Sequence, residues 1–135
     1  MEGVSDISQR ELIRTALRMR PERIIVGEVR GGEALDMLQA MNTGHDGSLS
    51  TGHANSTKDM LSRLETMVLM AMELRLTAVR KQIASGIDII IHLAKGRDKH
   101  RQVVEIAELT GIKEGEITQN LLFIREKGKL RRVGK

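Results

Sequence analysis

The sequence predicts an α/β fold built on a mainly parallel sheet, flanked by helices and closed by a C-terminal β-hairpin. Three observations favour this class. A short apolar run at residues 24–26 ends at a glycine, as a buried strand does. Residues 33–42 carry apolar side chains at helical spacing, and residues 87–93 form a nearly continuous β-branched run. Strand-type and helix-type patterns therefore alternate along one chain.

Length and composition limit the class of protein. With 135 residues the chain is long enough for one domain with a single modest core. Phe123 is its only aromatic residue, so that core must be built from Ile, Leu, Val and eight Met. The absence of cysteine excludes disulfides and Cys-based metal sites.

Charge and hydropathy point to the kind of partner. The sequence shows no signal-peptide pattern and no apolar run of membrane-spanning length, so we expect an intracellular protein. The net charge of +4 favours contact with anions. These anions include nucleotide phosphates, an acidic partner, lipid head groups and nucleic acid.

The chain begins with residues 1–7, which have no periodicity and which we expect to be extended or disordered. A helix is predicted over residues 8–20. Ser8 and Glu11 match a capping box at its start, and Pro21 ends it.

Three arginines of this helix, Arg10, Arg14 and Arg18, are four residues apart and share one face. One interpretation is a solvated basic face. The other is that Arg14 or Arg18 reaches a phosphate or an acidic group across a subunit boundary, since the guanidinium fork suits both.

An acidic residue lies at the C-terminal edge of the first predicted strand, residues 22–29. Glu28 comes directly after Gly27, at the carboxyl edge where parallel sheets hold ligands. A carboxylate there can hold a magnesium-bound water, or orient and deprotonate the water that attacks a γ-phosphate. The plainer alternative is a strand-end acid paired with Arg30.

A second short strand is predicted over residues 47–53 and ends at His53. It follows the helix at residues 33–42, which Gly44 can close in a left-handed conformation. His45 and His53 do not match a zinc-binding spacing, and the nearby acid is Asp46 alone, so a metal site is not expected. For His45 two interpretations stay open: it serves the same site as His53, or it packs at the turn.

The second half of the chain continues the alternation. We expect a helix from Ser56 to about Glu73, another from Thr77 to Gly86, and a strand at residues 87–93 covered on both faces. His92 interrupts that strand and is expected to be a hydrogen-bonded structural residue. Residues 102–109 and 117–125 alternate apolar and polar side chains and predict an antiparallel hairpin.

Two motifs carry a family resemblance: GEVRGGEA at residues 27–34 and GHDGSLSTGHANS at residues 44–56. With the residues around them they closely resemble the secretion and pilus-assembly ATPases of the type II/type IV secretion superfamily (GspE/PilT-like). The nearest branch resembles the CpaF-like ATPases of tight-adherence (Flp) pilus systems. In that family the first motif is an atypical Walker B and the second contains the histidine box. The resemblance runs from about Glu11 to about Glu126.

The resemblance implies the C-terminal part of a RecA-like P-loop NTPase domain over residues 8–126, followed by a basic tail at 127–135. It implies ATP and Mg²⁺ as cofactors, with the metal held through water by Glu28 rather than by a direct protein ligand. The implied catalytic residues are Glu28 and His53. The implied nucleotide-binding residues are Gly27, Arg30, His45 and Thr51.

A phosphate cradle of the form G-x-x-x-x-G-K-[ST] is missing from the sequence. Gly128-Lys129 is followed by Leu130 and lacks the preceding glycine. The resemblance places that cradle and an acidic box upstream of the first residue. The expectation is therefore a C-terminal part of an ATPase that neither binds nor hydrolyses ATP efficiently alone.

The leading functional prediction is a fragment of an ATP-hydrolysing motor for pilus assembly or protein secretion. The resemblance implies a hexamer in the cytoplasm, at the inner face of the cytoplasmic membrane, with an inner-membrane platform protein as partner. The alternative is a non-catalytic oligomerisation or nucleic-acid-binding module, although one aromatic residue makes base stacking, and hence nucleic acid, an unexpected partner. A third possibility is a domain-swapped fragment with an exposed sheet edge.

Overall fold

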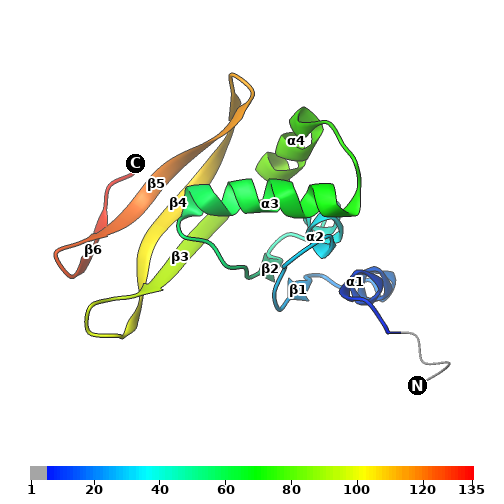
Figure 1. Cartoon of the computed structure of the whole chain (residues 1–135), viewed down its shortest axis with the longest axis horizontal. Coiled ribbons are helices and arrows are strands. Elements are labelled where there is room, and N and C mark those ends of the chain that lie inside the picture. Colours follow the sequence, from blue (N-terminus) through cyan, green and yellow to red (C-terminus); the bar gives the residue numbers. More distant parts are fainter. Residues whose placement is uncertain (1–5) are drawn as a thin grey trace.

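The computed structural model describes residues 6–135, which form four helices and two sheets (Figure 1). The helices are α1 (Gln9–Arg18), α2 (Glu33–Met41), α3 (Thr57–Ala71) and α4 (Leu76–Gly86). The strands are β1 (Ile25–Val26), β2 (Leu49–Ser50), β3 (Ile89–Lys95), β4 (Arg101–Lys113), β5 (Glu116–Glu126) and β6 (Lys129–Arg132). The helices lie on one side of the molecule, and strands β3–β6 form a four-stranded sheet on the other (Figure 1).

The predicted helix starts are confirmed. The Ser8 side chain accepts a hydrogen bond from the Glu11 amide, and the Glu11 side chain reaches back to the Ser8 amide, completing the capping box of α1. The Ser56 side chain likewise caps α3 by accepting from the Asp59 amide. Ahead of α1, Asp6 and Ile7 have no regular structure, and the rest of the stretch expected to be extended lies outside the described residues.

The expectation of a mainly parallel sheet is wrong for residues 6–135. Parallel pairing is confined to β1 and β2, with Ile25 opposite Leu49 and Val26 opposite Ser50. The larger sheet is antiparallel, in the order β3-β4-β5-β6. Hairpins can close such a sheet with short local turns, whereas every parallel pair requires a crossover segment.

Strand β3 is also not covered on both faces. It pairs with β4 only, and three of its apolar side chains, Ile89, Ile91 and Leu93, are 45–58% exposed. The side chains between them, at positions 90, 92 and 94, are less exposed. Because the outward residues are as apolar as the inward ones, the alternation was not visible in the sequence.

The predicted hairpin is confirmed as β4 and β5. The two strands extend further than expected and meet at a tight turn where Glu114 and Gly115 both have positive φ, 54° and 82°. Residues 129–132 were expected to belong to a tail, but they form β6, which pairs antiparallel with β5. All four β6 side chains are exposed.

The core lies where the helices meet β1 and β4. The largest fully buried side chains come from α2, α3 and α4 and include Leu35, Met37, Leu38, Val68, Val79 and Ile83. α4 packs on β4 and β5, which joins the helical layer to the antiparallel sheet. Within residues 6–135 no helix has the length and apolar character needed to cross a bilayer.

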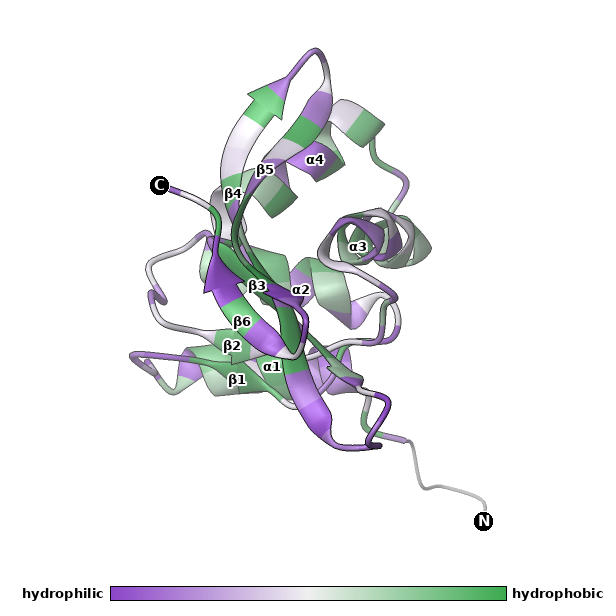
Figure 2. Cartoon of the chain, turned by 90° about the vertical axis from the view of Figure 1, so that its left-hand side faces the viewer, coloured by the Kyte–Doolittle hydropathy of each residue, from purple (hydrophilic) through white to green (hydrophobic). Residues whose placement is uncertain are grey.

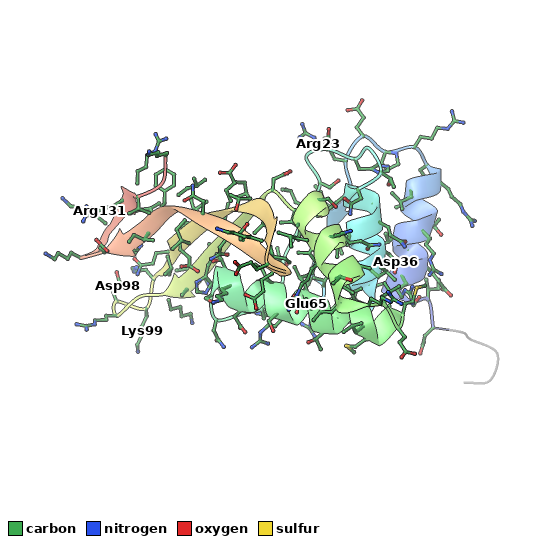
Figure 3. All side chains as sticks on the ribbon, turned by 90° about the horizontal axis from the view of Figure 1, so that it is seen from above. Arg23, Asp36, Glu65, Asp98, Lys99 and Arg131 are labelled. Atoms are coloured by element: carbon green, nitrogen blue, oxygen red, sulfur yellow. The ribbon has the colours of Figure 1, made fainter. Side chains whose placement is uncertain are left out.

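One buried acid anchors α1. Asp36 on α2 is 4% exposed at its side chain and accepts from Nε of Arg10 at 2.6 Å and Nε of Arg14 at 3.3 Å. The labelled Asp36 lies between the two helices in Figure 3. Because a buried carboxylate is costly without partners, this pairing fixes α1 against α2.

Candidate functional site

Two loops meet at the carboxyl edge of the parallel pair. The loop after β1 carries Glu28, and the loop after β2 carries His53. Hydrogen bonds extend the pairing beyond the strands: the Val29 amide donates to the Thr51 carbonyl at 2.9 Å, and the Thr51 hydroxyl donates to the Gly27 carbonyl at 2.5 Å. The two loops are therefore held side by side.

The carboxylate of Glu28 is the centre of the site. His53 Nε2 lies 2.7 Å from its Oε1, and Arg30 Nη2 lies 2.9 Å from its Oε2. The Glu28 side chain is 27% exposed, whereas Arg30 and His53 are 78% and 86% exposed. A half-buried carboxylate is thus flanked by two basic groups that face solvent.

These neighbours set the charge of the acid. The hydrogen bond and positive charge of Arg30 lower the pKa of Glu28 below its usual value, and protonated His53 acts in the same direction. Partial burial opposes this lowering but does not cancel it. Glu28 is therefore a carboxylate at neutral pH.

One oxygen of this carboxylate faces His53. Glu28 Oε1 is buried and lies 2.7 Å from His53 Nε2, and it accepts no hydrogen bond of standard geometry within residues 6–135. The imidazole nevertheless helps to lower the pKa of Glu28. A water molecule can reach Oε1 only where the exposed His53 side chain turns aside.

Two supporting residues were missed in the sequence. The Gln9 side chain on α1 donates to the Glu28 carbonyl at 2.8 Å, and no local pattern could reveal a contact across nineteen positions. Glu33 Oε1 accepts from the amides of Arg30 at 2.6 Å and Gly31 at 3.1 Å. Burial alone would raise the pKa of Glu33, but these backbone donors lower it. An acid three residues after Arg30, at a helix start, was a readable capping signal.

Gly27 and Thr51 contribute to the site by forming a hydrogen bond with each other. Gly27 offers its carbonyl to Thr51, and its Cβ position has open space with no heavy atom within 4 Å. Neither residue contacts the Glu28 carboxylate through a side-chain bond. Both hold the two loops together rather than line the carboxylate.

His45 is not brought to this cluster. It lies ahead of β2, where its carbonyl accepts from Ser48, whose hydroxyl in turn accepts from the Ile24 amide. This is the amino end of the parallel pair, opposite to Glu28. His45 Nδ1 lies 2.9 Å from the Ala40 carbonyl, so the residue closes the turn after α2.

The arginines of α1 also point elsewhere. Arg14 pairs within the chain to Asp36, and no ion pair involves Arg18 in the part of the chain that the structure describes. Both side chains remain exposed. A role across a subunit boundary stays a prediction. Arg18 is the better candidate, because Arg14 is already paired with Asp36.

Two hollows adjoin the site. A cavity of about 160 Å³ lies beside His53 and is also lined by Ser56, Met60 and His92. A larger groove of about 430 Å³ runs between β2 and β3 and is lined mostly by apolar side chains, among them Val29, Met37, Leu49, Ile89 and Ile91. Both hollows open where β2 and β3 have no strand partner on their facing sides.

The donor set tells which ligands the site can hold. Arg30 and exposed His53 can donate to a phosphate, and Glu28 can accept from water. No group of three His, Asp or Glu side chains converges within residues 6–135, so a metal fully caged by protein does not fit. Magnesium, which keeps several waters and binds few carboxylates, fits through a water on Glu28.

Comparisons with known proteins show which family the chain resembles. The sequence model of the family described as "Type II/IV secretion system protein" matches residues 1–128. The chain is 42% identical over 109 residues to a putative conjugal transfer protein of Mycobacterium tuberculosis, covering 81% of this chain and 31% of that protein. It is 42% identical over 105 residues to the type IV secretion system protein PtlH of Bordetella pertussis, covering 74% and 31%.

A solved structure is similar as well. The VirB11 ATPase from the Brucella suis type IV secretion system, crystallised with sulphate, matches with a TM-score of 0.71 and 32% identity, over 76% of this chain and 32% of that one. The chain thus spans about a third of the length of the proteins it matches. The family predicted from the two motifs is confirmed: the chain belongs to the type II/IV secretion system protein family.

Proposed function

We propose that this chain is the C-terminal part of an ATP-hydrolysing motor and supplies one half of its ATP site. The observation that carries the proposal is the convergence of Glu28, Arg30 and His53 at the carboxyl edge of two parallel strands. Ligands of open α/β sheets bind at such edges. Membership of a family that includes ATPases supports ATP as the ligand.

Glu28 is assigned to the attacking water. Its pKa is lowered, so it is ionised at neutral pH, and its Oε1 becomes accessible to water once the exposed His53 side chain turns towards the phosphate. A carboxylate in this state orients and polarises water, or holds a water on the metal. Bound Mg²⁺ would neutralise charge on the phosphates.

Arg30 and His53 are assigned to the terminal phosphate. Both are exposed and both contact Glu28, so each has donors to spare for a second acceptor. A γ-phosphate placed beside them would compete with Glu28 for their positive charge. Its departure after hydrolysis would return both groups to Glu28, which links the state of the nucleotide to the positions of the two loops.

The cradle for the remaining phosphates comes, in this proposal, from a part of the motor outside these 135 residues. The apolar groove between β2 and β3, with unpaired strand edges on both sides, is a place where a further segment of the motor would pack. An extended apolar segment in that groove would cover Ile89 and Ile91, which are exposed here. It would also end beside His53.

We further propose that the motor acts as a homohexamer on a platform protein at the inner face of the cytoplasmic membrane. An exposed apolar patch formed by Leu69, Met70, Met72 and Leu76 supports self-association. The patch borders the site, because the Met70 side chain lies against Gly31. The residues of the two motifs support assigning the motor to a tight-adherence pilus branch of the family.

The test uses the full-length protein encoded with this segment. We expect Glu28→Gln to lower kcat by at least ~100-fold while ATP binding persists, because the water loses its acceptor. His53→Gln should lower kcat as well. His45→Gln is the matched control and should leave kcat unchanged, because His45 lies at the other end of the strands.

The 135-residue chain alone should show no phosphate release above background. Turnover by the isolated chain that Glu28→Gln abolishes would contradict the assignment of the cradle to another part of the protein. If the full-length protein has no G-x-x-x-x-G-K-[ST] segment before this chain, the proposal that it is an ATP-hydrolysing motor is wrong.

A further inference from the structure

The positive charge of the chain is concentrated at one end of the antiparallel sheet. We define the basic end as residues 95–101 and 127–135, which contain nine Lys and Arg and one acid, Asp98. Its net charge of +8 exceeds the +4 of the whole chain, so the remainder is net negative. All nine of these basic residues are exposed.

Topology brings the two segments together. The β3–β4 turn and the β5–β6 turn lie at the same end of the sheet, because each intervening strand reverses direction. The labelled Asp98, Lys99 and Arg131 lie at this end in Figure 3. Figure 2, which views the molecule from that side, shows hydrophilic colouring on β6.

The β5–β6 turn of the basic end is fixed to the sheet by a half-buried arginine of β5. Arg125 Nε donates to the Val103 carbonyl on β4 at 2.7 Å, and its Nη1 donates to the Gly128 carbonyl at 3.0 Å. This guanidinium ties the β5–β6 turn to the neighbouring strand. The nearby acids are already engaged: Glu126, next to the basic end, pairs with Arg131 at 2.9 Å, and Asp98 accepts from the His100 amide at 3.1 Å.

We propose that the basic end binds an anionic lipid surface. Both turns project from one end and can therefore contact a plane together. Exposed Leu93, Leu130 and Val133 lie within or beside it and can enter the interfacial layer. Each Lys or Arg near an anionic membrane contributes about 1 kcal/mol of attraction without a matching pocket.

Other partners suit this surface less well. The centre of a stable protein interface is depleted of charge, whereas this surface is charged throughout. Single-stranded nucleic acid needs aromatic platforms, and the one aromatic residue, Phe123, lies on β5 outside the basic end. Duplex nucleic acid is the remaining competitor, and the experiment below includes it.

This inference deepens the proposed membrane-side location but does not use the nucleotide site. It is tested without nucleotide on the 135-residue chain, so its failure would leave the ATPase assignment intact. The measurement is co-sedimentation with phosphatidylcholine vesicles that contain or lack phosphatidylglycerol. We expect binding only when phosphatidylglycerol is present, weakening steadily as salt rises.

Two variants of equal net charge separate position from overall charge. The test variant replaces Lys95, Arg97, Arg101 and Lys129 with Gln, and the control replaces Lys58, Arg75, Lys81 and Lys113, which are exposed elsewhere. None of the eight side chains forms an ion pair within residues 6–135. The test variant should lose about 100-fold or more in vesicle partitioning, at roughly fivefold per residue. The control should lose less than about fivefold.

Amide NMR signals of the wild-type chain, followed as vesicles are added, test the surface without any variant. Signals from residues 95–101 and 127–135 should broaden first. Binding that ignores phosphatidylglycerol, equal losses in the two variants, or broadening centred elsewhere would overturn the proposal. Tighter binding to duplex DNA than to phosphatidylglycerol, compared per phosphate, would overturn it in favour of nucleic acid.

Discussion

His53 Nε2 lies 2.7 Å from Glu28 Oε1, although the two residues follow different strands and are separated by twenty-five positions. The contact exists because β1 and β2 are parallel, which places both carboxyl ends at one edge. The Thr51–Gly27 hydrogen bond continues the pairing up to the contact. The chemistry proposed for the chain thus depends on only a few residues of parallel sheet.

The lowered pKa of Glu28 predicts a specific pH dependence of stability. A carboxyl group whose folded-state pKa is below its unfolded value stabilises the fold above the unfolded value and loses that contribution as pH falls through the folded value. Wild type should therefore lose stability below about pH 4.5, its ordinary value, more steeply than Glu28→Gln. Urea midpoints measured from neutral pH to pH 3 would show this, and parallel curves would contradict it.

Arg30 should control the pKa of Glu28 more than His53 does, because its hydrogen bond is the largest cause of the lowering. Arg30→Gln should raise the pKa of Glu28 towards its ordinary value, and His53→Gln should raise it by less. The measurement is a titration of the Glu28 side-chain carboxyl carbon by NMR. His45→Gln should leave the titration unchanged, and an equal shift in that control would mean that the neighbours act through the fold.

The elements that the sequence predicted well depend on local signals. Ser8 and Ser56 each cap a helix through contacts three residues away, so their positions could be found without knowing the fold. The predicted end of α4 at Gly86 is also confirmed, with Ile87 as the residue that follows the helix. The extents of β1 and β2 were overestimated, because a strand is as long as its partner allows and the partner lies far along the chain.

The site divides in the same manner. Glu28, Arg30 and His53 could be named from two contiguous motifs, and the structure brings them together. His45 belongs to the same motif as His53, but the direction of β2 sends it to the opposite end, which no spacing rule reveals. Gln9 could not be found because its contact with Glu28 depends on how α1 packs.

Gly32 should not tolerate a larger residue. A Cβ at this position would lie 3.0 Å from the Ala71 Cβ and 3.3 Å from the Ala71 Cα, where α2 and α3 approach closely. We expect Gly32→Ala to lower the free energy of unfolding by about 1–2 kcal/mol, because helix backbones must separate. Thermal or urea unfolding would measure the loss.

Gly27→Ala is the matched control for this prediction. Its Cβ would meet open space, so the free energy of unfolding should change by no more than about 0.5 kcal/mol. If Gly27→Ala costs as much as Gly32→Ala, the loss at Gly32 is explained by the conformational freedom of glycine and not by the contact with Ala71.

The arginines of α1 should differ in their contributions to stability. Asp36 is buried, and Arg10 is its nearer partner, at 2.6 Å against 3.3 Å for Arg14. Removing Arg10 leaves the carboxylate with one distant and mostly exposed partner. Arg10→Gln should therefore lower the free energy of unfolding by about 2 kcal/mol, less than the loss of a fully buried pair because Arg10 is partly solvated.

Arg14→Gln should cost less than about 1 kcal/mol, and Arg18→Gln should have no measurable effect. Urea unfolding of the three variants gives the ranking directly. Equal losses at Arg10 and Arg14 would mean that Asp36 is held by the sum of both charges rather than by the shorter contact. A loss at Arg18 of the same size would contradict the pairing altogether, because among the described residues that side chain has no acidic neighbour within ion-pair distance.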